Sequence, residues 1–268
     1  MSVELNGGSL GAIADPRALA LREHNAERNY VSWYEKLFHL HSLKIRQLGD
    51  LQRPGLTVIN MGAGPSASYL DQAVHIVGNG GRYVALDLES LFILQGEERL
   101  KTYPGEVKDN ILIKQANVNL PLANDDTLVE SSSDVVIMSS LNANPFLGEL
   151  KAMYQKLMDD NSQSSAKIAS YLKPFIENTP LDAEDSALIS GSNAANILPI
   201  INAFLLLKPG GRLVYSWNDQ NMMIMNTLRI KQICEALGFE KVVIQDPITN
   251  MFTGSQTRLT YVVAEKPS

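Results

Sequence analysis

Cysteine is almost missing from this 268-residue sequence: the single residue, Cys234, cannot form a disulfide within the chain. A chain without disulfides suits a reducing compartment, so we expect a cytoplasmic protein. The first ten residues have neither a basic start nor an apolar core, and we expect no signal peptide. No apolar run reaches the roughly 18 residues that a membrane-spanning helix needs, so we expect no membrane partner.

Histidine and positive charge are also scarce. None of the four histidines stands near cysteine or acidic residues at metal-ligand spacing, so we expect no metal site. The chain carries 23 lysines and arginines against 29 acidic residues, a formal net charge of -6. Proteins that bind phosphate backbones usually present a basic surface, and the charge balance therefore argues against a nucleic-acid partner.

What is present is an alternation of strand and helix patterns. Hydrophobic residues make up 45% of the chain, enough for a sizeable core. Short apolar runs predict strands at residues 56–61, 83–86, 111–114, 134–138, 212–216, 241–245 and 258–264. Helical patterns separate most of them, notably at residues 22–48, 70–77, 90–100, 146–157, 166–175, 195–206 and 222–237. Such alternation predicts an α/β protein with a mainly parallel sheet.

A glycine-rich turn, N-M-G-A-G from Asn60 to Gly64, follows the first predicted strand. Glycines permit a tight turn and leave bare backbone for a ligand, and the next helix begins with unpaired N–H groups. The turn alone does not select a cofactor, because Gly62, Gly64 and Ala67 also satisfy the dinucleotide fingerprint G-x-G-x-x-A. A purely structural turn is the other interpretation.

Asp87 ends the second predicted strand. A carboxylate at this place can accept hydrogen bonds from both hydroxyls of a ribose, in NAD or in an adenosyl sulfonium cofactor. Two alternatives are open: Asp87 caps the helix that begins near Ser90, or Glu89 binds the ribose instead.

The segment L-L-K-P-G-G-R-L at residues 206–213 distinguishes between the two cofactor interpretations. Its own role is structural, because it combines a helix end, a Pro-Gly-Gly turn and a strand start. Here the sequence resembles class I (Rossmann-like) S-adenosylmethionine-dependent methyltransferases, in which L-K-P-G-G-x-L precedes the fifth strand. The resemblance covers about residues 57–264 and includes the turn E-A-L-G-F at 235–239.

The resemblance implies S-adenosylmethionine as the cofactor and assigns its contacts. Gly62 and Gly64 match the glycine loop beneath the methionine moiety, and Asp87 matches the ribose-binding acid. The segment A-N-V-N-L-P resembles the loop after strand three. Asn117 takes the place of the residue that contacts the adenine amino group, and Val118 that of the residue packed on the ring.

Two of the expected cofactor contacts depart from the family. Asn60 stands where an acid is usual, so it can form hydrogen bonds but supplies no charge for the ammonium group of the cofactor. Asn117 replaces a common aspartate and can still accept a hydrogen bond from the adenine amine.

The fourth strand runs into S-S-L-N-A-N-P-F at residues 139–146, the end that faces the sulfonium in the family. We expect Ser139 to contact the cofactor and Asn142 or Asn144 to lie beside the ligand, with an ordinary polar loop as the alternative. No histidine or acid stands here as a general base. This favours an acceptor that is already nucleophilic, or a general base that stands elsewhere in the chain.

The predicted N-terminal helix carries four aromatic residues, Tyr30, Trp33, Tyr34 and Phe38. One interpretation is packing against the sheet edge. The other is a lid over the cofactor, with a tyrosine hydroxyl or ring near the sulfonium. We expect Asn142, Asn144 and Tyr34 to orient the attacking group.

The resemblance implies a Rossmann-like, seven-stranded, mainly parallel sheet with helices on both faces. We expect an N-terminal arm and cap helix over residues 1–49 and a methyltransferase-like domain over residues 50–268. A helical insertion at about 143–208 is much longer than an ordinary connection. We expect residues 20–48 and part of 143–200 to close over the cofactor and form the acceptor pocket.

The activity implied is methyl transfer, in which the acceptor attacks the methyl group in line and S-adenosylhomocysteine leaves. The acidic charge and the aromatic cluster favour a small-molecule acceptor. Three alternatives are open. They are an enzyme that consumes the cofactor without a methyl acceptor, by cyclisation or elimination, an NAD-dependent oxidoreductase, and a non-catalytic cofactor-binding protein.

Overall fold

A computed structural model describes residues 34–64, 66–120, 122, 127–139, 147–160, 162–177, 194–219, 224–250 and 257–268. The chain divides into two compact units, residues 1–41 and 42–268. Of the first unit, the described part is residues 34–41, which form the beginning of helix α3. All other described residues belong to the second unit, and the predicted domain boundary at residue 49 stays a prediction.

Seven strands form one sheet in the order β3-β2-β1-β4-β5-β7-β6. Their bounds are β1 Thr57–Met61, β2 Arg82–Asp87, β3 Ile111–Gln115, β4 Ser133–Ser139, β5 Leu207–Asp219, β6 Glu240–Asn250 and β7 Thr257–Glu265. The strands from β3 to β5 are parallel, whereas β7 runs antiparallel to both β5 and β6. The predicted seven-stranded, mainly parallel sheet is confirmed.

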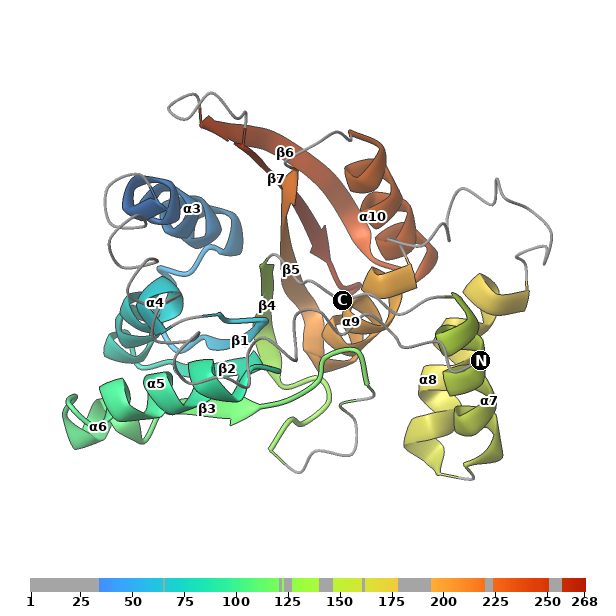
Figure 1. The fold of residues 1–268 in the computed structure, drawn as a ribbon, viewed down its shortest axis with the longest axis horizontal. Helices are drawn as coiled ribbons and strands as arrows, with labels where there is room; N and C mark the ends of the chain where they lie inside the picture. The colour runs from blue at the N-terminus through green and yellow to red at the C-terminus, as the bar shows by residue number, and fades with distance from the viewer. Residues whose placement is uncertain are drawn as a thin grey trace, which may run out of the picture. The chain divides into compact units, whose positions relative to one another are not determined.

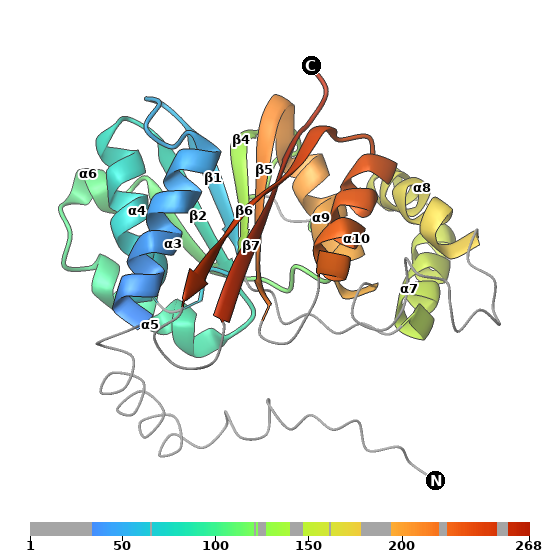
Figure 2. The same cartoon turned by 90° about the horizontal axis from the view of Figure 1, so that it is seen from above.

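The helices are α3 Tyr34–Gly49, α4 Ser66–Gly78, α5 Ser90–Leu100, α6 Gly105–Lys108, α7 Leu147–Asp159, α8 Gln163–Glu177, α9 Ala194–Leu206 and α10 Ile224–Ala236. Helices α4 and α5 cover one face of the sheet, and α9 and α10 cover the other (Figures 1 and 2). Helices on both faces are therefore confirmed. In the described part of the chain, no helix combines the length and the apolar character needed to span a membrane.

Strand β5 begins at Leu207, earlier than the predicted residue 212. The ladder with β4 shifts register here, because Ser133 pairs with Leu207 and the next pair is Val135 with Arg212. Gly210 has a φ of 72°, which lets the chain make this bulge. The L-K-P-G-G segment thus belongs to the strand as an irregular start.

Lys208 of this segment has a structural role. Its Nζ lies 3.0 Å and 3.1 Å from the two carboxylate oxygens of Asp134 on β4. Asp134 Oδ2 also accepts a hydrogen bond of 2.8 Å from the backbone N of Thr57, where β1 begins. The motif therefore fastens three neighbouring strands at their amino ends, as expected for a structural turn.

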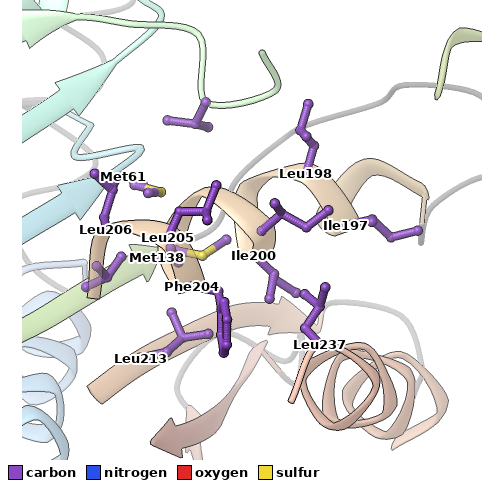
Figure 3. Close-up of a cluster of buried hydrophobic side chains, with 14 of the residues drawn as sticks. Met61, Met138, Ile197, Leu198, Ile200, Phe204, Leu205, Leu206, Leu213 and Leu237 are labelled. Carbon is purple, nitrogen blue, oxygen red and sulfur yellow. The ribbon is translucent and has the colours of Figure 1, made fainter. Parts of the chain in front are cut away.

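Helix α9 is buried on all sides along its described side chains. Every residue from 197 to 206 is buried, including seven large apolar side chains, Ile197, Leu198, Ile200, Ile201, Phe204, Leu205 and Leu206. Met61, Met138 and Leu213 from the sheet and Leu237 from the turn after α10 surround it (Figure 3). Burial of seven such side chains contributes on the order of 10–20 kcal/mol before conformational entropy is subtracted.

The helical insertion supplies the outer cover of α9. Helices α7 and α8 pack together, and α8 contacts α9 on the side away from the sheet (Figures 1 and 2). Phe204 of α9 meets Tyr171 of α8 edge to face at 5.4 Å and Phe239 at 4.9 Å between ring centroids. The described part of the insertion thus forms an additional helical layer outside α9. A cap over the ligand stays a prediction for residues outside the described ones.

Leu172→Ala should show that α7 and α8 unfold cooperatively with the rest of the core. Leu172 lies on α8 with 0% exposure, so its truncation should lower the free energy of unfolding by about 2–5 kcal/mol. Leu94→Ala on α5, where the leucine is 58% exposed, is the matched control and should change it by less than about 0.5 kcal/mol. Urea denaturation measures both. A separate early transition for α7 and α8 would contradict the single core.

Candidate functional site

The glycine loop leaves β1 at its carboxyl end and folds over the end of β2. Gly62 and Gly64 have φ values of 70° and 68°, in the left-handed region that favours glycine. The backbone N atoms of Gly62 and Ala63 donate hydrogen bonds to Leu86 O at 2.8 Å and 3.0 Å. The loop is therefore fixed to the end of β2, and it turns at two positions where a side chain would strain the backbone.

Asp87 joins the loops that follow three neighbouring strands. Its Oδ2 accepts a hydrogen bond of 2.8 Å from Gly64 N in the glycine loop, and its Oδ1 accepts one of 2.9 Å from Glu89 N. Its backbone O accepts a third, of 2.8 Å, from Ala116 N after β3. A carboxylate has about four acceptor positions, so about two are left for a ligand.

The capping alternative for Asp87 is not what the structure shows. Glu89 is the N-cap of α5, and its side chain accepts a hydrogen bond of 3.5 Å from Leu91 N. Asp87 instead binds backbone groups before the helix begins. Because Glu89 is occupied at the cap, Asp87 is the better placed of the two acids for a ribose.

The loop after β3 begins with a local turn. Asn117 Oδ1 accepts a hydrogen bond of 3.0 Å from Asn119 N, so the side chain predicted to meet adenine shapes its own loop. Val118 is 6% exposed and belongs to the hydrophobic core. Their contacts with adenine stay predictions.

Asn202 of α9 holds the same loop from the core side. Its Nδ2 donates to the backbone O of Val118 and of Leu120, and its Oδ1 accepts from Leu122 N. Sequence reasoning missed this residue because it lies more than 80 positions further along the chain. An amide inside the apolar run I-L-P-I-I-N-A-F-L-L was the available signal.

Asn60, on β1 just before the glycine loop, bonds a tyrosine on the neighbouring strand. Its Nδ2 donates a hydrogen bond of 2.9 Å to Tyr83 Oη on β2, whereas its Oδ1 has no partner among the described residues. Tyr83 stacks on Tyr69 of α4 with 6.2 Å between ring centroids. Burial raises the pKa of Tyr83, and burial together with Asp87 and Glu97 raises the pKa of Tyr69 to about 12.

Ser139 ends β4 at the same edge of the sheet. The preceding residue, Met138, pairs with Met61, so Ser139 lies level with Gly62, the residue that follows β1. Ser139 is half-buried and pairs with Ser216 of β5. The structure therefore places Gly62, Gly64, Asp87, Asn117 and Ser139 along the carboxyl ends of adjacent strands.

The other predicted site residues fall where side chains are not described. Asn142, Asn144, Tyr30 and Trp33 lie outside the described residues, and Tyr34 and Phe38 are described in backbone only, on α3. Their roles stay predictions. Among the described side chains, no group of three or more histidine, cysteine or acidic residues is arranged to hold a metal ion.

Comparison with known proteins finds likeness in fold and not in sequence. No protein-family model and no curated protein matches the chain. The solved structure of a SAM-dependent O-methyltransferase from Thermotoga maritima matches with a TM-score of 0.50 and 13% identity, over 85% of this chain and 65% of that one. The structure of the [4+2]-cyclase SpnF matches with a TM-score of 0.53 and 10% identity, over 88% and 83%.

The chain has the class I S-adenosylmethionine-dependent methyltransferase fold. This chain spans 65% of the length of the Thermotoga maritima enzyme, and at these identities the shared property is the fold. In this methyltransferase fold the strand order reverses between β1 and β4. Ligands of open α/β sheets bind outside the carboxyl ends at such a switch point, which is where the glycine loop and Asp87 lie.

Tyr83→Phe should destabilise the base of the glycine loop. The change removes the acceptor of Asn60 Nδ2 and leaves a buried donor unpaired, which should lower the free energy of unfolding by about 1–3 kcal/mol. Tyr154→Phe is the control, because that hydroxyl bonds Glu177 at the exposed surface. Chemical denaturation compares the two. An equal loss of unfolding free energy in both variants would mean that the buried Asn60–Tyr83 bond stabilises the protein no more than an exposed one.

Proposed function

We propose that the chain binds S-adenosylmethionine and transfers its methyl group to a small-molecule acceptor. The observation that carries this proposal is the convergence at Asp87. One half-buried carboxylate holds the glycine loop and the β2 loop, and the same residue holds the β3 loop through its backbone. These are the three loops that the methyltransferase resemblance assigns to methionine, ribose and adenine.

The described residues suit this cofactor chemically. The remaining acceptor positions of Asp87 can take the two ribose hydroxyls. At Gly62 and Gly64 no side chain would stand between the loop backbone and the cofactor. Asn60 Oδ1 is a buried acceptor without a partner among the described residues, and an ammonium donor would satisfy it.

Methyl transfer to an acceptor that is already nucleophilic needs no general base at this site. When bound, the cofactor supplies a methyl group that is already electrophilic. The chain then has to orient the acceptor and exclude water, and Ser139 stands at the β4 end where the acceptor would approach. The net charge of -6 disfavours a polyanionic acceptor.

A second candidate is consumption of the cofactor without a methyl acceptor. The [4+2]-cyclase SpnF shares this fold, so the fold by itself does not determine methyl transfer. The segment 139–146 also offers only hydroxyls and amides, with no histidine or acid.

The cofactor proposal predicts that Asp87→Asn abolishes recognition of the ribose. Wild type should bind S-adenosylhomocysteine more tightly than its 2′-deoxy analogue by about 1.5–3 kcal/mol, the scale of a hydrogen bond to a charged group. The variant should lose most of this difference. Isothermal titration calorimetry measures it, and the comparison of two ligands removes any general loosening of the loops.

Glu89→Gln is the matched control for that experiment. An amide oxygen can still cap α5, so the preference for the ribose hydroxyl should persist. Should this variant lose the preference instead, Glu89 would be the ribose ligand. Binding of NADH without binding of S-adenosylhomocysteine would refute the cofactor proposal altogether.

Product analysis separates the two candidate functions. With labelled cofactor and a small-molecule fraction of cell extract, we expect methyl label in a small molecule and accumulation of S-adenosylhomocysteine. Mass spectrometry of the same incubation without extract is the control and should show intact cofactor. A cofactor-derived product formed without extract would favour the second candidate, and label found only in RNA or protein would refute the small-molecule acceptor.

A further inference from the structure

We infer that Asn202 is a positioning residue that sets adenine selectivity by fixing the loop after β3 from the core side. The inference rests on the proposed function, because it gives that loop the task of meeting adenine. Asn202 acts through the loop backbone and need not contact the cofactor itself.

The geometry uses the whole amide group. Asn202 is 1% exposed, and its Nδ2 lies 2.9 Å from Val118 O and 2.9 Å from Leu120 O. Its Oδ1 accepts a hydrogen bond of 3.2 Å from Leu122 N. Both N–H groups and the carbonyl oxygen therefore bind backbone atoms of a single short segment.

The segment needs such a partner because no helix supports it. Parallel strands are usually joined through a helix, yet the described residues between β3 and β4 contain none. Their buried backbone groups must find partners elsewhere. Asn202 supplies three, from a helix whose other described side chains are all apolar.

The segment is held at both ends. Ala116 N donates to Asp87 O at one end, and Asn202 binds Val118, Leu120 and Leu122 at the other. Asn117 lies between these two attachments. The position of Asn117 relative to Asp87 therefore depends on both attachments, and Asn202 supplies the second.

Loss of this attachment should reduce selectivity for the adenine amino group. A hydrogen bond is sensitive to small displacements, whereas apolar contact with a ring tolerates them. The variants Asn202→Leu and Asn202→Ala both remove the three bonds. Leucine keeps nearly the same volume and alanine leaves a cavity, so the two separate hydrogen bonding from packing.

The control is Ser133→Ala. Ser133 has 0% exposure, and its Oγ donates a hydrogen bond of 2.9 Å to Leu206 O at the end of the same helix. It makes a buried bond to α9 but bonds none of the three loop residues that Asn202 holds, Val118, Leu120 and Leu122. Its loss should destabilise the protein without changing selectivity.

The first measurement is hydrogen exchange of the unliganded protein. In wild type, the amide of Leu122 should exchange slowly because Asn202 Oδ1 accepts its hydrogen. In both Asn202 variants it should exchange at least about tenfold faster relative to amides in β1, and Ser133→Ala should leave that ratio unchanged. An unprotected Leu122 amide in wild type overturns the inference without need of any variant.

The second measurement is the ratio of the dissociation constants for S-inosylhomocysteine and S-adenosylhomocysteine, which differ at the base amino group. Wild type should prefer the adenosyl ligand by about tenfold or more, and the Asn202 variants should approach no preference. An unchanged ratio, or an equal fall in Ser133→Ala, overturns the role of Asn202. Failure of wild type to bind either ligand refutes the proposed function, and the inference with it.

Discussion

An apolar helix must be enclosed, and most of this architecture satisfies that requirement for α9. Its residues from 197 to 206 have no face suited to water. The sheet covers one side, α10 and its following turn cover a second, and α8 covers the outer side through contacts such as Tyr171 with Phe204. The long insertion between β4 and β5 thus has a structural reason in its described part, independent of any ligand.

The same enclosure explains why a polar group on α9 is informative. A buried amide costs free energy unless it is fully bonded, and in this core it is bonded to the loop after β3. That loop lies at the edge where Asp87 joins the other two. The loop after β3 is therefore attached at its beginning to Asp87, at the end of β2, and further along to Asn202 in the core.

The sequence predicted the parts of this arrangement that depend on near neighbours. Strand and helix patterns, the glycine turn and the acid after β2 are local signals, and their places in the fold agree with them. The Asn60 bond to Tyr83 and the Asn202 bonds to the β3 loop join residues far apart in the chain. Hydrophobic periodicity is a local pattern and does not predict which distant residues form a hydrogen bond. The start of β5 was misplaced because a bulged strand with a left-handed glycine has the same composition as a turn.

The distance along the chain between Asn202 and its loop also has a consequence during synthesis. The strands β1, β2 and β3 and the glycine loop leave the ribosome long before α9, because the partners of Asn202 lie 80 to 84 residues earlier. The nascent N-terminal half can assemble its local parallel pairs, but the backbone after β3 has no amide to bind. The loop after β3 is therefore fixed late, once residues beyond 202 have been made. A chain halted before that point would carry the glycine loop without the amide that fixes the loop after β3.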